Sequence, residues 1–352
     1  MKRIILSVFA AAVTAAWAIP ASAAAVTAAW AIPASAGDVT FSGQYRLRGE
    51  YVDNNDFADA TNDANDFWGQ RVRLTANAKA TDDVSAKITL QDTRTWGAET
   101  SQLTDLGTNV NSNVDLHEAY LNVSNIFGTP VSFRAGRQEL AYGDERLVGS
   151  FGWSNNGRAF DGAKLMFSND AVNVDFFTTT LTEAGVDGDD TYFNGLYATL
   201  KQLIPNNSLD LYVFNLNGQT SEATNHYTFG ARLKGAAAGV DYTAEGAYQT
   251  GDIDTTPLVL GDTTDLAAYA FAVKAGYTLP TPMKIRVGAE YDFATGADTD
   301  AGENETFQNL FPTNHAHFGI ADVTGANQWS NISAWSVNAS ADLNEKLRLF
   351  VA

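Results

Sequence analysis

Residues 38–51, DVTFSGQYRLRGEY, alternate strictly between two kinds of side chain. Successive side chains of a strand point to opposite faces, so this period of two predicts a strand with one apolar and one polar face. The odd positions carry Val39, Phe41, Gly43, Tyr45, Leu47 and Tyr51, and the even positions carry Thr40, Ser42, Gln44, Arg46, Arg48 and Glu50.

The same alternation returns along the chain in about fifteen segments, many of them close to the ~10 residues that a tilted strand needs to cross a bilayer. Strands of ordinary soluble proteins average about five or six residues. Clear examples are QRVRLTANAKA at 70–80, VSAKITLQ at 84–91 and KIRVGAEYDF at 284–293.

The connections between these segments alternate in length, which is typical of an up-and-down barrel with short periplasmic turns and long external loops. A secreted soluble β-sandwich or solenoid is the alternative, but neither requires this rhythm. Short connections fall at 81–83, 124–129, 168–170, 202–207, 235–238, 279–282 and 343–346, and long ones at 52–66, 97–112, 139–157, 181–190, 250–265 and 295–333.

We therefore predict an all-β fold, a transmembrane antiparallel up-and-down β-barrel with about 15 strands visible and 16–18 when complete. A closed single-chain bacterial barrel normally has an even number of strands, so that no edge faces lipid. The chain ends LRLFVA at 347–352, without a terminal aromatic residue. We expect residues 37–352 to form the barrel domain, truncated at its C-terminus.

The N-terminus carries an export signal. Lys2 and Arg3 precede an apolar stretch that ends in the small-residue cleavage site at 21–23, which predicts a secretory signal peptide. The segment AAVTAAWAIPASA occurs at 11–23 and again at 24–36. We predict that residues 1–36 are removed, and one sequence does not say whether the duplication is natural. The bacterial outer membrane is the expected location.

Composition excludes several classes of protein. The 352 residues include no cysteine, which rules out disulfides, Cys-ligated metal sites and a thiol nucleophile. The net charge of −19 argues against nucleic-acid binding, which needs a basic footprint. Beyond the signal peptide there is no run of ~18 apolar residues that would form a transmembrane helix.

Most of the negative charge falls in the predicted external loops, whereas basic residues fall mainly in the strands. Side chains on the polar faces of the strands would point into the lumen, where Arg and Lys favour anions. The alternative is that these charges form cross-strand ion pairs that only stabilise the wall. The first half contributes Arg46, Arg48, Arg71, Arg73, Lys79, Lys87, Arg94 and Arg134 as predicted pore-lining residues.

Residues 136–165, GRQELAYGDERLVGSFGWSNNGRAFDGAKL, resemble the signature region of the alginate export porin family, and DLHEAYLNV at 115–123 resembles the strand before it. The resemblance implies a monomeric barrel of about eighteen strands with an arginine-rich, constricted lumen. It adds Arg137 and Arg158 to the predicted pore-lining residues, with Arg146 beside them. It also implies that residues 139–157, with Gly143, Asp144 and Gly149, form a loop that folds into the pore.

The function predicted from these features is an outer-membrane porin, without enzymatic activity, for passive passage of anionic solutes or export of an acidic polysaccharide. The alternative is the barrel sleeve of a porin–cytochrome electron conduit, in which a partner supplies the haem. Expected partners are the lipid bilayer, lipopolysaccharide, anionic small molecules or polysaccharide, and periplasmic or surface proteins, but no nucleic acid.

No cofactor and no metal site are predicted. His315 and His317 stand two apart in a long loop without a fixed third ligand. The acidic loops at 53–66 and 187–190 offer clustered oxygens, a weak case for Ca²⁺, because neither has the spacing of an EF-hand.

Overall fold

The computed structural model describes residues 38–52, 65–97, 114–183, 190–201, 205–218, 224–254, 263–297, 304–313, 315, 317–318, 329–345 and 347–351. The chain divides into two compact units, Met1–Ala36 and Gly37–Ala352. The predicted signal peptide, with its repeated segment, therefore lies outside the described residues. No helix of the described part is long and apolar enough to span a membrane.

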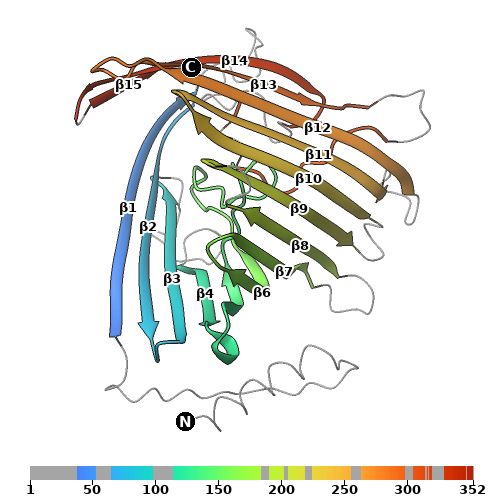
Figure 1. Cartoon of the computed structure of the whole chain (residues 1–352). Helices are drawn as coiled ribbons and strands as arrows, with labels where there is room; N and C mark the ends of the chain where they lie inside the picture. The colour runs from blue at the N-terminus through green and yellow to red at the C-terminus, as the bar shows by residue number, and fades with distance from the viewer. Residues whose placement is uncertain are drawn as a thin grey trace. The chain divides into compact units, whose positions relative to one another are not determined.

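From Gly37 onward, the described residues form a single antiparallel sheet of fifteen strands, as the alternating segments predict. Each strand pairs with the next along the chain, and no ladder between described residues joins the last strand to the first. Figure 1 shows this order along one curved sheet. The strands are β1 (Asp38–Val52), β2 (Asn65–Lys79), β3 (Val84–Thr95), β4 (Asp115–Val123), β5 (Val131–Gln138), β6 (Phe160–Ser168), β7 (Val172–Thr182), β8 (Thr191–Leu200), β9 (Asn207–Gly218), β10 (Asn225–Ala237), β11 (Val240–Asp254), β12 (Thr263–Thr278), β13 (Arg286–Ala294), β14 (Ile332–Asn344) and β15 (Leu347–Val351).

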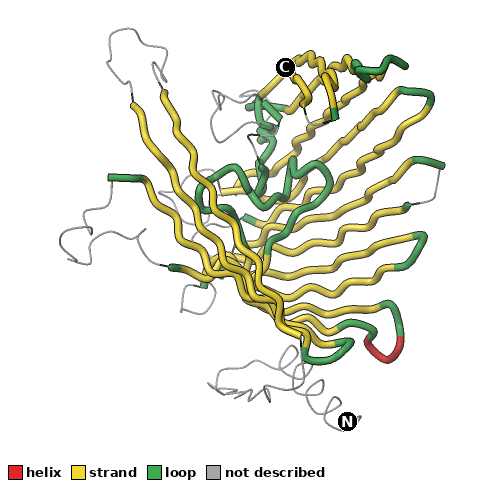
Figure 2. Tube along the Cα trace, turned by 90° about the vertical axis from the view of Figure 1, so that its left-hand side faces the viewer, coloured by secondary structure: helices red, strands yellow, loops and turns green. Residues whose placement is uncertain are grey.

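The two faces of the sheet follow the period of two. Apolar side chains at one parity of each strand are exposed: Phe41 is 72% exposed and Trp335 is 76% exposed. Such a row of exposed apolar side chains suits contact with lipid rather than with water. The opposite face, here called the inner face, carries the polar parity, and the loop segments drawn in green in Figure 2 lie against it.

The connections differ between the two ends of the sheet. At one end short turns join the strands, and a single 3-10 turn at Ile126–Gly128 connects β4 to β5. At the other end β5 and β6 are joined by residues 139–159, here called the inner loop. Because β4, β5 and β6 have only 9, 8 and 9 residues, the inner loop begins part of the way along the wall.

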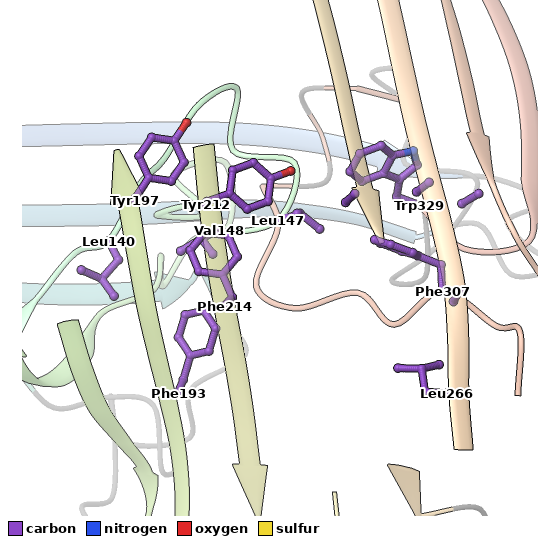
Figure 3. Close-up of a cluster of buried hydrophobic side chains, with 14 of the residues drawn as sticks. Leu140, Leu147, Val148, Phe193, Tyr197, Tyr212, Phe214, Leu266, Phe307 and Trp329 are labelled. Carbon is purple, nitrogen blue, oxygen red and sulfur yellow. The ribbon is translucent and has the colours of Figure 1, made fainter. Parts of the chain in front are cut away.

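The inner loop contributes three residues, Leu140, Leu147 and Val148, to the main apolar cluster. Its Leu140 and Val148 are each 1% exposed and belong to the same cluster as aromatic side chains on the inner face of β8 and β9. Phe193 and Phe214 lie 5.7 Å apart, and Figure 3 shows them beside the loop residues. Each buried side chain of this size contributes roughly 1.5–3 kcal/mol. The apolar core thus lies between the loop and the wall.

Candidate functional site

Arginines of β1 and β2 hold one side of the inner loop through its backbone carbonyls. Arg46 donates to the carbonyl oxygens of Gly152 at 2.8 Å and Ser154 at 2.9 Å. Arg71 donates to the same two oxygens at 3.2 and 3.1 Å. Arg48 donates to the carbonyl of Trp153 at 2.7 Å, and its guanidinium lies 4.3 Å from the centre of that ring. Three cations therefore converge on three consecutive residues that bring no negative charge.

The other side of the inner loop is held by ion pairs to strands from the opposite part of the sheet. Asp144 pairs with Arg232 of β10. Arg146 pairs with Glu290 and, at 2.6 Å, with Asp292, both of β13. Arg146 is 4% exposed, so both its positive charge and the carboxylates that face it are largely removed from water. Breaking such a buried pair by removing one partner typically costs ~3–5 kcal/mol.

The middle of the inner loop pairs with a second loop, residues 304–313. Val148 and Phe311 form a parallel bridge, with hydrogen bonds from Gly149 N to Phe311 O at 2.8 Å and from Phe311 N to Leu147 O at 2.7 Å. Arg158 donates to the carbonyl of Pro312 at 3.1 Å. The two loops therefore form one layer over the inner face.

A glycine is favoured where the end of the inner loop passes β2. Gly157 has a φ of +70°, and a Cβ added there would lie 2.6 Å from a guanidinium nitrogen of Arg73. The left-handed backbone favours glycine here, whereas the guanidinium is the end of a flexible side chain and could shift away from a Cβ.

Charges around the inner loop favour its docked position. The pKa of Asp144 is lowered despite its burial, because Arg232 and Lys274 lie beside the carboxylate. Glu139 has a lowered pKa for a similar reason: burial opposes ionisation, but the hydrogen bond and charge of His117 outweigh it. His317, which lies 2.8 Å from the carbonyl of Asp144, has its pKa lowered to about 3 by burial and by the nearby positive charge of Arg146.

Seven of the ten predicted pore-lining residues lie on the inner face of the first five strands. Besides the arginines that hold the loop, Lys87 pairs with Glu118, and Arg134 lies 4.2 Å from the ring of Tyr120. Arg158 is in the inner loop itself. The seven are Arg46, Arg48, Arg71, Arg73, Lys79, Lys87 and Arg134.

Arg94 and Arg137 lie on the outer face, which differs from the expectation that they line the pore. Arg94 is opposite Gln70 in the ladder, whereas the inner Arg71 is opposite Thr93. Arg137 is three residues from the inner Arg134 and therefore has the opposite parity. Each is neutralised on its own face, Arg94 by Asp92 at 2.7 Å and Arg137 by Asp161 at 2.6 Å.

Sequence patterns did not identify the ion pairs that fix the inner loop. Asp144 and Arg146 lie in the signature region, but their partners are 88 and 144 residues away along the chain. The run of charged residues Asp144-Glu145-Arg146 inside a glycine-containing loop is the available signal. Strand parity does indicate that Arg232, Glu290 and Asp292 face inward, without indicating what they contact.

No metal site is found among the residues that the structure describes, where no group of three or more His, Asp or Glu side chains has a suitable arrangement. The acidic segments 53–64 and 184–189 lie outside those residues. The two loop histidines contact different residues: His315 stacks on Trp153 with ring centres 3.7 Å apart, whereas His317 forms a hydrogen bond with the backbone carbonyl of Asp144.

A cavity of about 550 Å³ lies between the start of the inner loop and the inner face of β6–β10. Its size is within the ~300–1,000 Å³ of typical small-molecule sites. Strand ends from the short-turn side contribute much of its lining, so the cavity faces that end of the sheet. The lining includes Tyr142, Gly143, Asp175, Tyr197, Asp210, Arg232 and Lys234.

Several solved outer-membrane proteins share this fold. OccK8 (OprE) of Pseudomonas aeruginosa has a TM-score of 0.55 and 12% identity, over 87% of this chain and 79% of that chain. OccK9 (OpdG) of the same organism has a TM-score of 0.55 and 12% identity, over 87% of this chain and 78% of that one. OccK11 (OpdR), also from that organism, has a TM-score of 0.53 and 10% identity, over 87% and 73%. At these identities the likeness establishes the fold, an outer-membrane β-barrel.

A comparison with curated proteins gives no significant match. The sequence profile described as Alginate export, in contrast, matches residues 38–352, which covers every described strand. Together with the porin fold, this match places the protein in the bacterial outer membrane as a porin-type channel. The chain belongs to the alginate export family.

Proposed function

We propose that this channel passes small anionic solutes passively along an interior whose first wall is basic. The observation that carries the proposal is the inner face of β1–β5, where basic side chains outnumber carboxylates among the described residues. Arg46 and Arg71 have hydrogen-bond partners that are neutral carbonyl and amide oxygens, so their positive charge is not cancelled locally. The carboxylates on these faces are Asp38, Glu50, Asp115 and Glu118.

Fixed positive charge in a confined, water-filled passage lowers the electrostatic barrier for anions and raises their local concentration. No chemical step is needed, because the solute moves down its gradient. We propose small solutes rather than a polysaccharide strand, because the inner loop is held to both β1–β2 and β10–β13. It also occupies inner surface that a haem-carrying partner would need, so we do not propose the sleeve function.

The test is permeation into liposomes that contain the full chain. Gluconate and N-methylglucamine are similar in size and opposite in charge, so a difference between their rates of liposome swelling reflects charge rather than size. We expect gluconate to enter about tenfold faster or more. Equal rates, or faster entry of N-methylglucamine, would refute anion preference, and entry of an acidic polysaccharide at a comparable rate would refute the restriction to small solutes.

A further inference from the structure

The cations of the inner face differ in what they already bind. Arg46 and Arg71 are committed to the carbonyls of the inner loop. Arg232, in the wall of the 550 Å³ cavity, is paired with Asp210 at 2.8 Å and with Asp144. These groups can attract an anion at long range, but each would have to release a partner to bind one directly.

Lys234 is different. It lines the same cavity and its side chain is exposed. Among the described residues it has neither a carboxylate within ion-pair distance nor a hydrogen-bond acceptor for its ammonium group. The acids of the cavity lining are paired with other cations, Asp175 with Lys164 at 3.0 Å and Asp210 with Arg232. Lys234 acts on Asp144 only at longer range, and that carboxylate is paired with Arg232. An incoming carboxylate would therefore find one free cation beside acids that are already neutralised.

The rest of the lining is rich in groups that hydrogen-bond hydroxyls. Asn173, Thr199 and Ser208 line the cavity from β7, β8 and β9. Tyr142 completes the loop side, with its own hydroxyl donating to Asp175 at 3.1 Å. Two of the aromatic residues in the lining, Tyr142 and Tyr197, stack on each other at 4.6 Å, and each also stacks on a second ring, Phe177 at 5.7 Å and Tyr212 at 5.6 Å, so their faces are not free to stack on a ligand. The third, Phe167, has the outer parity of β6. The cavity is thus suited to a polar ligand rather than an aromatic one.

We propose that this cavity is a binding site for a small hydroxylated carboxylate, with Lys234 as the partner of the carboxylate and the neighbouring hydroxyl and amide groups as partners of the ligand hydroxyls. The inference rests on the proposed passage of anions and places a binding site on their path. Lys234 lies three residues from the end of β10 at a short turn, which is the periplasmic end in barrels of this class. A solute would meet this site between the periplasm and the inner loop.

The experiment is single-channel recording in KCl with gluconate added on the short-turn side, where occupancy of the site blocks the chloride current. Hexanoate at pH 8 is the probe with the same carbon number and charge but no hydroxyls. We expect gluconate to block at a concentration at least fivefold lower than hexanoate. We expect Lys234→Gln to raise the half-blocking concentration of gluconate about tenfold, and Lys234→Arg to raise it less than threefold.

The matched control is Lys284→Gln, which removes one positive charge from an exposed turn at the same end of the sheet. Its half-blocking concentration should stay within twofold of the wild type. An unchanged value for Lys234→Gln, an equal change for Lys284→Gln, or equal block by hexanoate would overturn the site. If the wild type prefers chloride to potassium while Lys234→Gln leaves the block unchanged, the site alone is wrong; a wild type without that preference refutes the proposed function.

Discussion

Arg46 and Arg71 share the same two acceptors, so their substitutions should be strongly non-additive. Both donate to the carbonyls of Gly152 and Ser154, and Arg46 adds a bond of 3.1 Å to Asn155. Hydrogen bonds that involve a charged group contribute ~1.5–3 kcal/mol, and leaving buried acceptors unpaired adds to the cost. When only Arg46 is lost, Arg71 still covers both carbonyls.

We therefore expect Arg46→Gln to weaken docking of the inner loop by about 1 kcal/mol and the double variant Arg46→Gln/Arg71→Gln by about 3 kcal/mol or more. Since ~1.4 kcal/mol is tenfold in an equilibrium constant, the ratio of time in the wider, undocked conductance state to time in the narrower, docked state should rise about fivefold for the single variant and more than 100-fold for the double variant. The assay is long single-channel recording of each variant at constant salt and voltage.

The control for this prediction is Arg94→Gln, which removes a guanidinium from the outer face, where Asp92 pairs with it. Its dwell times should change less than twofold. The reasoning is refuted if the double variant gates like the wild type, or if Arg94→Gln has the same effect. A lower preference for anions without any change in gating would show that Arg46 and Arg71 act only through their charge.

Three further variants test other contacts. Burial lowers the pKa of His317 to about 3. The imidazole is therefore neutral in the docked state but becomes protonated below pH ~6.5 in the undocked state. Docking should weaken by ~1.4 kcal/mol for each pH unit below that value. The fraction of time in the wider, undocked conductance state between pH 6.5 and 4.5 measures this, and a His317→Gln channel with the same acid response would contradict it. Gly157→Ala should loosen the loop end, because an alanine is strained at a φ of +70°, and faster protease cleavage at 150–158 is the expected sign; unchanged cleavage argues against that backbone conformation. Phe193→Ala should destabilise the folded barrel by ~3–5 kcal/mol in urea titrations, since this ring is fully buried, and a loss below 1 kcal/mol would be inconsistent with the core described.

The strands could be predicted because alternation is a local signal. About fifteen segments were expected and the described residues form fifteen strands, with the exposed apolar parity where the pattern placed it. Strict parity also places Arg94 and Arg137 outward. In the sequence analysis, Arg94 is assigned to the lumen as a basic residue of a strand, and Arg137 because it stands in the region that resembles the family. The type of side chain was given more weight there than its position in the alternation.

The arrangement of the inner loop could not be predicted in the same way. The resemblance to a known family implied that residues 139–157 enter the pore, and the structure does place this loop against the inner face. Its anchors depend on contacts between residues about 80 to 170 positions apart, such as Arg71 with Ser154 and Glu145 with Thr313. Nothing in a local pattern indicates which inward charge meets which loop residue, and that pairing decides which cations stay available to a solute.

The zero-current potential of the full-length channel in a tenfold KCl gradient tests the central claim most directly. A basic wall whose charge is only partly neutralised predicts a reversal potential of the sign set by chloride permeation. It also predicts that replacing Lys234 by Gln reduces the potential while Lys284→Gln does not. A potential set by potassium, or no preference between the two ions, would contradict the account.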